Sequence, residues 1–279
     1  MTKEFEISDA EFERFRDFFY RKTGLFFADT KRYFVDKRLI DRIKATEHRS
    51  FRSYFTFLRF QVSGEELETL INAMTVNETY FFREDYQLKC MVDTVLDKVA
   101  KRKSNGHPIR IWSVPCSTGE EPYSIALFLL DSWPAINNVD VELVASDIDT
   151  RVLRECERGV YSTRSVQYLP DAVLKKYFKP LPNGCFQISD DLKASVDFRQ
   201  VNLVVREQTR SFRDFDLVFC RNLLIYFDDI SRREAIECLY DALNPGGFLF
   251  LGNSETLSRS SSLFTVRRFS NCVIYQKPV

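Results

Sequence analysis

Residues 111–124 (IWSVPCSTGEEPYS) place small side chains directly before two carboxylates, at the expected junction of a strand and a helix. Because residues 116–119 are all small, the backbone there can approach a ligand closely. The segment has one glycine and no following Gly-Lys-Ser/Thr, which excludes a dinucleotide fingerprint and a phosphate-binding loop. Glu120 and Glu121 would repel a phosphate at that helix N-terminus and would attract a cationic ligand. The alternative is that both glutamates only complement the helix dipole.

A second acidic motif, Asp147 and Asp149 in residues 145–150 (ASDIDT), closes the next expected strand. In nucleoside-binding sheets an acid at this point accepts hydrogen bonds from ribose hydroxyl groups. Either aspartate alone is a weak signal. The spacing from residues 111–124 fits one strand–helix–strand unit, so the two motifs together support a nucleoside site.

A third motif, residues 77–84 (NETYFFRE), sets one fixed cation among aromatic side chains. The aromatic residues 80–82 have a purely structural interpretation, in which they pack an interface. The functional interpretation is that Asn77, Thr79 and Arg83 close over a cofactor from the linker side.

The fourth motif, residues 219–228 (FCRNLLIYFD), follows an apolar strand in the middle of the expected sheet. Arg221 and Asn222 fall at the end of that strand, where we expect them to point into the ligand crevice. Tyr226 lies four residues further on. A single tyrosine is more often part of a core or a rim than of a site.

Strands that alternate with helices from about residue 107 are expected to position these motifs. Such alternation predicts an α/β fold with a mostly parallel sheet that is covered on both faces. A section of about fifty residues interrupts the pattern, and we expect it to form a subdomain of short strands around 185–188 and 196–199. The expected main strands are 109–114, 139–145, 217–220, 248–252 and 272–276, and the expected helices are 122–130, 150–158 and 230–243.

Before residue 76 the pattern is purely helical. Capping-box pairs at Ser8–Glu11 and Ser63–Glu66 each precede apolar residues at helical spacing. Gly24 suits a helix C-terminus, and further helices are expected after Thr30 and near Ser50.

Charge and composition exclude several classes of protein. The chain has 40 basic and 40 acidic side chains, which argues against a dedicated nucleic-acid binder. No apolar stretch approaches the roughly 20 residues of a membrane span, and the N-terminus lacks the pattern of a signal peptide, so we expect a cytoplasmic protein. Seven scattered cysteines without a CxxC pair, and only two histidines, predict neither a disulfide framework nor a metal site.

Basic residues are nevertheless concentrated in one stretch. Residues 31–60 hold nine basic side chains against three acidic ones. This excess is either an ordinary solvated helix face or a docking surface for an acidic partner, where charge would raise the encounter rate.

The motifs NETYFFRE, PCSTGEEPYSIA, ASDID, FDLVFCRNLLIYFD and GGFLFLGNSETL occur in this order over nearly the whole chain. The ordered set resembles the chemotaxis receptor glutamate methyltransferases, the CheR family. The resemblance implies a Rossmann-like S-adenosylmethionine methyltransferase domain with an inserted small β-subdomain, preceded by an all-helical N-terminal domain. The implied boundaries are 1–75 for the helical domain, 76–106 for a linker and connecting helix, and 107–279 for the methyltransferase domain, with the β-subdomain at about 160–200.

The same resemblance implies S-adenosyl-L-methionine as the methyl donor, with S-adenosyl-L-homocysteine as its product. Glu121 would face the cationic methionine end and Asp147 the ribose, although Glu120 stays open as the main contact in place of Glu121. Arg83 and Tyr226 would lie nearest the transferred methyl group. The implied cofactor-binding set is Asn77, Thr79, Arg83, Glu121, Asp147, Asn202, Leu203, Arg221 and Asn222.

The implied substrates are glutamate side chains on cytoplasmic helices of chemoreceptors, docked by the basic helix at about 31–44. Some family members grip a C-terminal receptor peptide with a longer, glycine-richer loop than residues 179–185 (KPLPNGC), so we expect no such tether here. Val114 and Pro115 replace the small residues usual in the first motif, and Pro115 removes one backbone donor. Two alternatives stay open: a methyltransferase for another target, and a non-catalytic scaffold that binds the cofactor as a signal.

Overall fold

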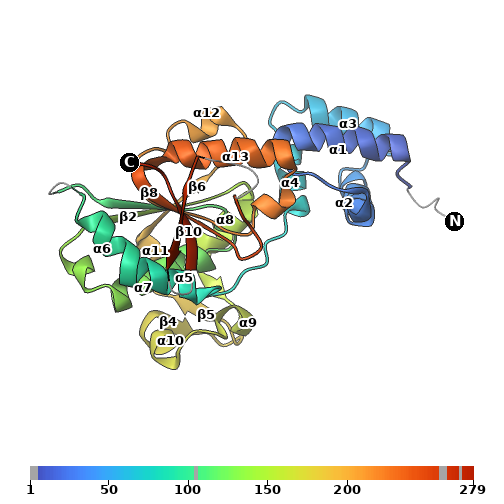
Figure 1. The fold of residues 1–279 in the computed structure, drawn as a ribbon. Coiled ribbons are helices and arrows are strands. Elements are labelled where there is room, and N and C mark those ends of the chain that lie inside the picture. The colour runs from blue at the N-terminus through green and yellow to red at the C-terminus, as the bar shows by residue number, and fades with distance from the viewer. Residues whose placement is uncertain (1–5, 104–105, 258–262, 270–271) are drawn as a thin grey trace. The chain divides into compact units, whose positions relative to one another are not determined.

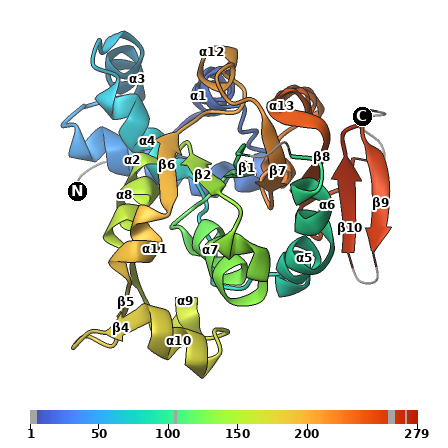
Figure 2. The ribbon, with the colours of Figure 1, turned by 90° about the vertical axis from the view of Figure 1, so that its left-hand side faces the viewer.

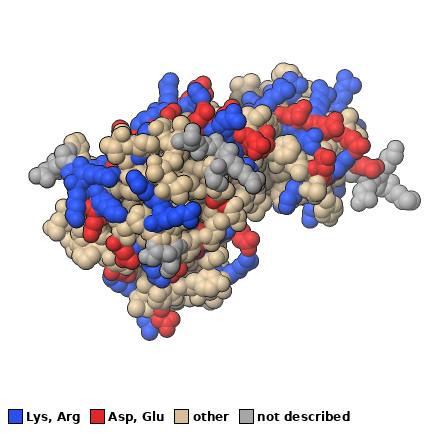
Figure 3. Space-filling model, in the orientation of Figure 1, with Lys and Arg blue, Asp and Glu red and all other residues tan. Residues whose placement is uncertain are grey.

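The computed structural model describes residues 6–103, 106–257, 263–269 and 272–279, and it divides into two compact units. The smaller unit comprises Met1–Val76 together with Tyr226–Ser231, and the larger unit comprises Asn77–Ile225 and Arg232–Val279 (Figure 1). None of the helices in the described ranges is long and apolar enough to cross a membrane. Figure 3 shows Lys and Arg as well as Asp and Glu side chains on the visible face of both units.

Four α-helices build the described part of the smaller unit, as the helical pattern predicts. Ser8 and Glu11 form the expected capping box, and Gly24 ends the first helix with a left-handed φ of 73°. Ser50 caps the third helix by accepting a hydrogen bond from the backbone of Ser53. Apolar side chains from all four helices, with Phe15, Phe19 and Tyr54 fully buried, form one core. The helices are α1 (Asp9–Thr23), α2 (Arg32–Ala45), α3 (Phe51–Phe60) and α4 (Glu65–Met74).

The capping box expected at Ser63 and Glu66 is wrong. The N-cap residue of helix α4 is Gly64, which has a φ of 72° and forms no side-chain cap. The Glu66 carboxylate instead accepts two hydrogen bonds from Arg42, at 2.9 and 2.6 Å, and one from the Tyr54 hydroxyl at 2.7 Å. A buried carboxylate with three donors satisfies its charge better than a local backbone contact would, so the tertiary pairing determines where Glu66 points.

A short segment from far along the sequence, Tyr226–Ser231, completes the smaller unit. Phe227 forms an antiparallel bridge with Leu25, and the Tyr226 carbonyl accepts a hydrogen bond of 3.1 Å from the backbone of Phe26. The Tyr20 hydroxyl donates to Asp228 at 2.9 Å. The backbone of Tyr226 is therefore held by α1 and the loop after it, which the sequence pattern did not predict.

The larger unit is built on a seven-stranded sheet with the order β6-β2-β1-β7-β8-β10-β9. All neighbouring strands run parallel except β10, which is antiparallel to both β8 and β9. Each of the predicted main strands is found, although the strand predicted at 248–252 begins at Leu243, and the edge strand Thr265–Phe269 was not predicted. The strands are β1 (Ile109–Ser113), β2 (Val141–Asp147), β6 (Val196–Gln200), β7 (Phe215–Cys220), β8 (Leu243–Leu251), β9 (Thr265–Phe269) and β10 (Cys272–Gln276).

Helices cover both faces of this sheet. Figures 1 and 2 show α5, α6 and α7 on one face, with α12 and α13 on the opposite face. The predicted helices at 122–130, 150–158 and 230–243 are confirmed within two residues at each end. The helices are α5 (Asp85–Cys90), α6 (Leu96–Ala100), α7 (Glu120–Ser132), α8 (Thr150–Arg158), α11 (Asp190–Ala194), α12 (Arg206–Thr209) and α13 (Asp229–Ala242).

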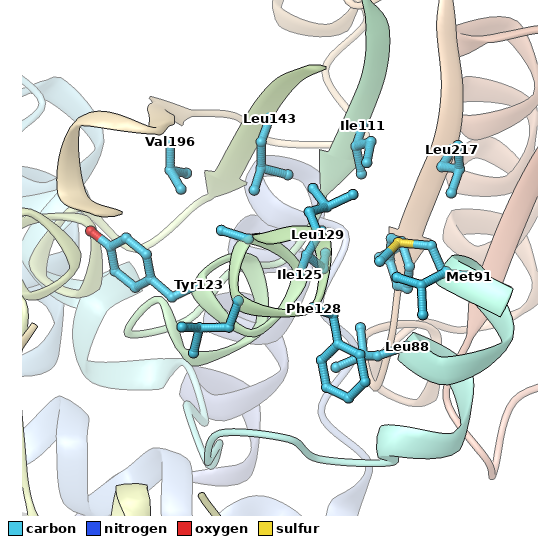
Figure 4. Close-up of a cluster of buried hydrophobic side chains, with 14 of the residues drawn as sticks. Leu88, Met91, Ile111, Tyr123, Ile125, Phe128, Leu129, Leu143, Val196 and Leu217 are labelled. Carbon is cyan, nitrogen blue, oxygen red and sulfur yellow. The ribbon is translucent and has the colours of Figure 1, made fainter. Parts of the chain in front are cut away.

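Apolar side chains of α7 pack against the parallel strands to form the main core. In Figure 4, Ile125 and Leu129 of α7 face Ile111, Leu143 and Leu217 of three neighbouring strands. These five side chains are almost completely buried. Because α7 follows β1 directly, this packing fixes the turn that carries the first predicted motif.

The expected subdomain is a three-stranded antiparallel sheet with the order β3-β5-β4. It consists of β3 (Val160–Tyr161), β4 (Phe178–Pro180) and β5 (Phe186–Ile188), with α9 (Thr163–Val166) and α10 (Asp171–Tyr177). The prediction that residues 196–199 belong to it is wrong, since β6 pairs with β2 at the edge of the main sheet, where Val196 lies beside Leu143. The sequence of a short strand does not specify which strand it pairs with, and the buried Val196 packs into the main core.

Candidate functional site

The turn between β1 and α7 depends on Gly119. This residue has a φ of 97°, and a Cβ atom there would lie 2.9 Å from the Tyr161 hydroxyl and 3.1 Å from the Cys156 sulfur. The chain therefore needs glycine both for conformation and for space. The amide of Cys116 donates to the carbonyl of Ser146 at 2.8 Å, which ties the turn to the end of β2.

The two adjacent glutamates at the start of α7 have different partners. Glu120 accepts hydrogen bonds from Ser165 at 2.5 Å and from Thr118 at 2.6 Å, both hydroxyl groups. Glu121 accepts from the Ser113 hydroxyl at 2.8 Å and from Arg221 at 3.0 Å. Burial raises the pKa of both carboxyl groups above the ordinary value. Glu121 is thus the glutamate whose hydrogen bonds link α7 to the ends of β1 and β7.

Arg221, directly after β7, is the centre of a buried charge cluster. Its side chain is 3% exposed, and its guanidinium lies 3.0 Å from Glu121 and 3.2 Å from Glu84. It also donates to the carbonyl of Arg83 at 2.6 Å. The Nε atom has no hydrogen-bond partner among the described residues. Two carboxylates share one cation here, and Glu84 is a member that the sequence interpretation missed.

Asp147, the last residue of β2, faces the turn after β1. Its carboxylate accepts from the amide of Ser117 at 2.9 Å and from the amide of Asp149 at 3.0 Å. Burial raises the pKa of Asp147 to about 6, although these amides oppose the shift. Each carboxylate oxygen keeps a further lone pair that can accept a hydrogen bond.

Asp149 has a structural role in the described residues. It caps α8 by accepting from the amides of Arg151 and Val152, and its other oxygen accepts from the Asn77 amide group at 2.8 Å. The Ser117 hydroxyl donates to the carbonyl of Asn77 at 3.1 Å. The third motif is therefore brought to the same edge of the sheet as the first two.

The rest of the third motif is folded tightly. Phe82 and Glu84 both have left-handed backbone angles, with φ of 60° and 53°. The amide of Phe82 donates to the Ser124 hydroxyl at 3.0 Å, which fixes the motif to α7. The half-buried Arg83 donates to the carbonyl of Glu78 at 2.9 Å. Thr79 is half-buried in the same turn.

The loop after β7 is tied to the loop after β8 by Glu255, another residue that the sequence interpretation missed. The Glu255 carboxylate accepts from the backbone amides of Asn222 at 2.7 Å, Leu224 at 2.7 Å and Gly252 at 2.8 Å. Asn222 itself has a φ of 59°. The loop that carries Arg221 and Asn222 is thus held by three bonds to one carboxylate.

Asn202 and Leu203, assigned only through the resemblance, are both buried just after β6. The Asn202 side chain accepts from the amide of Val204 at 3.2 Å, and its own amide donates to Gln208 at 2.8 Å. Tyr226 lies in the smaller unit and its side chain is exposed.

Two family descriptions cover almost the whole chain. Residues 10–75 match the CheR methyltransferase all-alpha domain, and residues 77–273 match the CheR methyltransferase SAM-binding domain. The chain belongs to the CheR methyltransferase family. It is an S-adenosylmethionine-dependent methyltransferase that serves chemotaxis, and the expected fold class and cofactor are confirmed.

Full-length relatives agree with the CheR assignment. The chain is 58% identical to chemotaxis protein methyltransferase 2 of Vibrio cholerae serotype O1, over 99% of this chain and 95% of that protein. It is 35% identical to the chemotaxis protein methyltransferase of Escherichia coli (strain K12), over 96% and 91%. Among solved structures, the N-methyltransferase NodS from Bradyrhizobium japonicum in complex with S-adenosyl-L-homocysteine has a TM-score of 0.41 and 14% identity, over 73% of this chain and 90% of that one.

The CheR cofactor fits the residues that this edge of the sheet gathers. Its methionine end carries positive groups, which the excess carboxylate of the Glu84, Glu121 and Arg221 cluster can balance. Its carboxylate can accept a hydrogen bond from the unpartnered Nε atom of Arg221. Its ribose hydroxyl groups can donate to Asp147.

Proposed function

We propose that this chain transfers the methyl group of S-adenosylmethionine to glutamate side chains of chemoreceptor helices and forms glutamyl methyl esters. The observation that carries the proposal is the ion pair of Glu121 and Arg221, whose side chains are 13% and 3% exposed, together with the buried Asp147 at the end of β2, in a chain whose relatives are chemotaxis protein methyltransferases. The proposed site for this chemistry is the carboxyl edge of the parallel strands, where these acidic side chains can bind a cationic ligand. The cytoplasm is the expected location because the proposed substrate helices are cytoplasmic.

The proposed acceptor needs no general base, because a glutamate carboxyl group is already ionised at neutral pH. When bound, the cofactor supplies an electrophilic methyl group on a positively charged sulfur. The chain's own residues then have to align the reactants and to exclude water that would solvate both charges.

In this proposal each site residue either binds the cofactor or aligns the reactants. Glu121 faces the cationic methionine end, and Asp147 accepts from the ribose. Arg83 steadies charge near the acceptor, and Tyr226 positions the acceptor by a hydrogen bond. The remaining proposed cofactor contacts are Asn77, Thr79, Asn202, Leu203, Arg221 and Asn222.

The basic helix α2 remains the proposed docking element, but fewer of its basic side chains are available to a partner than its composition indicates. Arg42 is held by Glu66, and Arg38 donates to the carbonyls of Ala73 and Phe34. Lys37 and Lys44 are exposed and lie seven residues apart, hence on one side of the helix. We therefore assign the attraction for an acidic receptor helix to these lysines and not to the arginines.

The short loop of the β-subdomain supports docking without a peptide tether. Its turn closes on itself, because the amide of Leu181 donates to the carbonyl of Cys185 at 2.8 Å and Gly184 donates to Leu181 at 3.1 Å. We propose that methylation is equally fast with receptors that lack a C-terminal peptide extension.

The test is transfer of tritium from methyl-labelled S-adenosylmethionine to membranes that contain chemoreceptors, with receptor-free membranes as the control. The proposal predicts label on the receptor band that mild alkali releases, as expected for a carboxyl ester. Alkali-stable label would indicate another acceptor. Cofactor binding without any transfer would favour a non-catalytic scaffold.

A further inference from the structure

The turn that follows α1 holds the backbone of the segment that contains Tyr226. Gly24 ends the helix with a left-handed φ of 73°, which lets the chain leave the helix axis. Leu25 then pairs antiparallel with Phe227, and the amide of Phe26 donates to the carbonyl of Tyr226 at 3.1 Å. Two residues of this turn therefore fix the backbone from which the Tyr226 side chain extends.

A network of side-chain hydrogen bonds holds the same segment at its other end. The Tyr20 hydroxyl, in the last turn of α1, donates to the Asp228 carboxylate, whose two oxygens lie 2.9 and 3.0 Å away. The Ser231 hydroxyl donates to the Tyr20 oxygen at 3.0 Å, and the Ser231 amide donates to Asp228 at 2.9 Å. Because hydrogen bonds to a carboxylate are stronger than those between neutral groups, the Tyr20 contact is a firm link from α1 to this segment.

Tyr226 lies midway between two anchored residues. On one side, the amide of Leu224 donates to the Glu255 carboxylate at 2.7 Å. On the other side, Asp228 is held by Tyr20. With both flanking residues fixed, the direction of the Tyr226 side chain depends on both anchors.

The network also has a purely structural interpretation. Asp228 accepts from an amide in the first turn of α13, so it caps that helix, and Tyr20 would only satisfy the same carboxylate. In that case the Tyr20 hydroxyl would affect stability alone. A role in positioning Tyr226 would instead make the effect of Tyr20 depend on whether the Tyr226 hydroxyl is present.

We propose that Tyr20 is a positioning residue for methyl transfer: through Asp228 it holds the segment around Tyr226 so that the Tyr226 hydroxyl meets the acceptor. The inference rests on the proposed function, in which Tyr226 positions the acceptor by a hydrogen bond. Small errors of alignment cost large factors in rate, so a residue that touches no reactant can still set the rate. The helical domain then contributes to catalysis in addition to its proposed docking role.

Hydrogen exchange of the full chain, measured by mass spectrometry of its peptides, tests the anchor without any acceptor. Tyr20→Phe keeps the ring and removes the hydroxyl group. We expect the peptide that contains residues 226–231 to exchange about tenfold faster in this variant, because local opening no longer breaks that hydrogen bond. Tyr240→Phe, at a half-buried position near the far end of α13, is the matched control and should leave this peptide unchanged.

A double-mutant cycle separates positioning from stability. Methyl transfer at saturating S-adenosylmethionine is compared among the wild type, Tyr20→Phe, Tyr226→Phe and the double variant. Tyr20→Phe should lower the rate about three- to tenfold, with the affinity for S-adenosylmethionine within about twofold of the wild type. In the Tyr226→Phe background the same change should cost less than about 1.5-fold, because the hydroxyl group that Tyr20 aligns is already absent.

Three results would each overturn the proposal: wild-type exchange of residues 226–231 in Tyr20→Phe, a wild-type rate in that variant, and losses that multiply in the double variant, as a structural role predicts. Failure of the proposed function would have a different sign. A wild type that labels an acceptor other than glutamate would contradict that function, and the ratios among the four proteins would still decide the role of Tyr20.

Discussion

At the scale of single residues, Asp147 connects burial to a measurable pH dependence. Burial raises its pKa from 3.8 to about 6, so the folded protein holds this proton more tightly than the unfolded chain does. Taken alone, this group makes the fold less stable as pH rises from 3.8 to about 6, and adds no further change at higher pH.

Asp147 should also make cofactor binding depend on pH. We expect the ionised form of Asp147 to accept from the ribose. Affinity for S-adenosylmethionine should then fall about tenfold between pH 7 and pH 5, because each pH unit below the pKa lowers the ionised fraction by up to tenfold. Titration calorimetry at several pH values measures this. Asp147→Asn should bind weakly, with a flatter profile over the same range, and an equally steep profile in that variant would assign the dependence to another group.

Arg83→Ala and Tyr226→Phe should each lower methyl transfer by about 10- to 100-fold, because loss of alignment raises the barrier without removing a chemical group that reacts. Both proteins should stay folded with nearly the wild-type melting temperature, since neither side chain belongs to a hydrophobic core. Full activity in both variants would show that the proposed roles are wrong. Steady-state transfer rates with a receptor fragment provide the measurement.

At the scale of elements, the carboxyl ends of β7 and β8 are joined through one side chain. Glu255→Gln replaces one acceptor oxygen by an NH2 group. In one orientation this group faces the backbone N–H of Leu224, and in the other it faces those of Asn222 and Gly252, so at least one donor loses its acceptor. We expect cofactor affinity to fall about tenfold and the melting temperature to fall by several degrees.

Glu234→Gln, an exposed position on α13, is the control for the Glu255 experiment and should change neither quantity. Wild-type affinity in Glu255→Gln would mean that the loop holds Arg221 and Asn222 without this carboxylate.

Periodicity predicted most of the elements correctly, because apolar spacing is a local signal. The helix at Thr150–Arg158 and the strands that follow the βα pattern are examples. The sheet to which Val196–Gln200 belongs was not predictable in this way, since strand pairing is a long-range choice. Ser63 failed as a cap for a similar reason, because Glu66 pairs with Arg42 of another helix.

The candidate site was predictable only where a motif sits at a strand end. Glu121, Asp147 and Arg221 meet at one edge because parallel strands end there. Glu84 and Glu255 gave no such signal, because their partners are set by how distant loops fold back on each other.

At the scale of the whole molecule, the helical domain should control receptor binding independently of cofactor binding. Lys37→Glu with Lys44→Glu should lower transfer to receptors several-fold at low salt, and less at high salt, because exposed charges are screened. Affinity for S-adenosylmethionine should not change. Unaltered transfer at low salt would remove α2 from the docking surface.

Arg42→Ala should behave differently from the lysine variants, since it leaves the Glu66 carboxylate buried without its cation. We expect a loss of about 3 kcal/mol in the free energy of unfolding, measured with denaturant. Lys44→Ala, an exposed position on the same helix, should change it by less than about 0.5 kcal/mol. A similar small effect for Arg42→Ala would show that the pair is not structural.

The most direct test of the account is tandem mass spectrometry of a chemoreceptor cytoplasmic fragment after incubation with the purified chain and S-adenosylmethionine. The account predicts added methyl groups on glutamate side chains of the receptor helices. Methyl groups on lysine, arginine or cysteine side chains, or an unmodified fragment in the presence of bound cofactor, would contradict it.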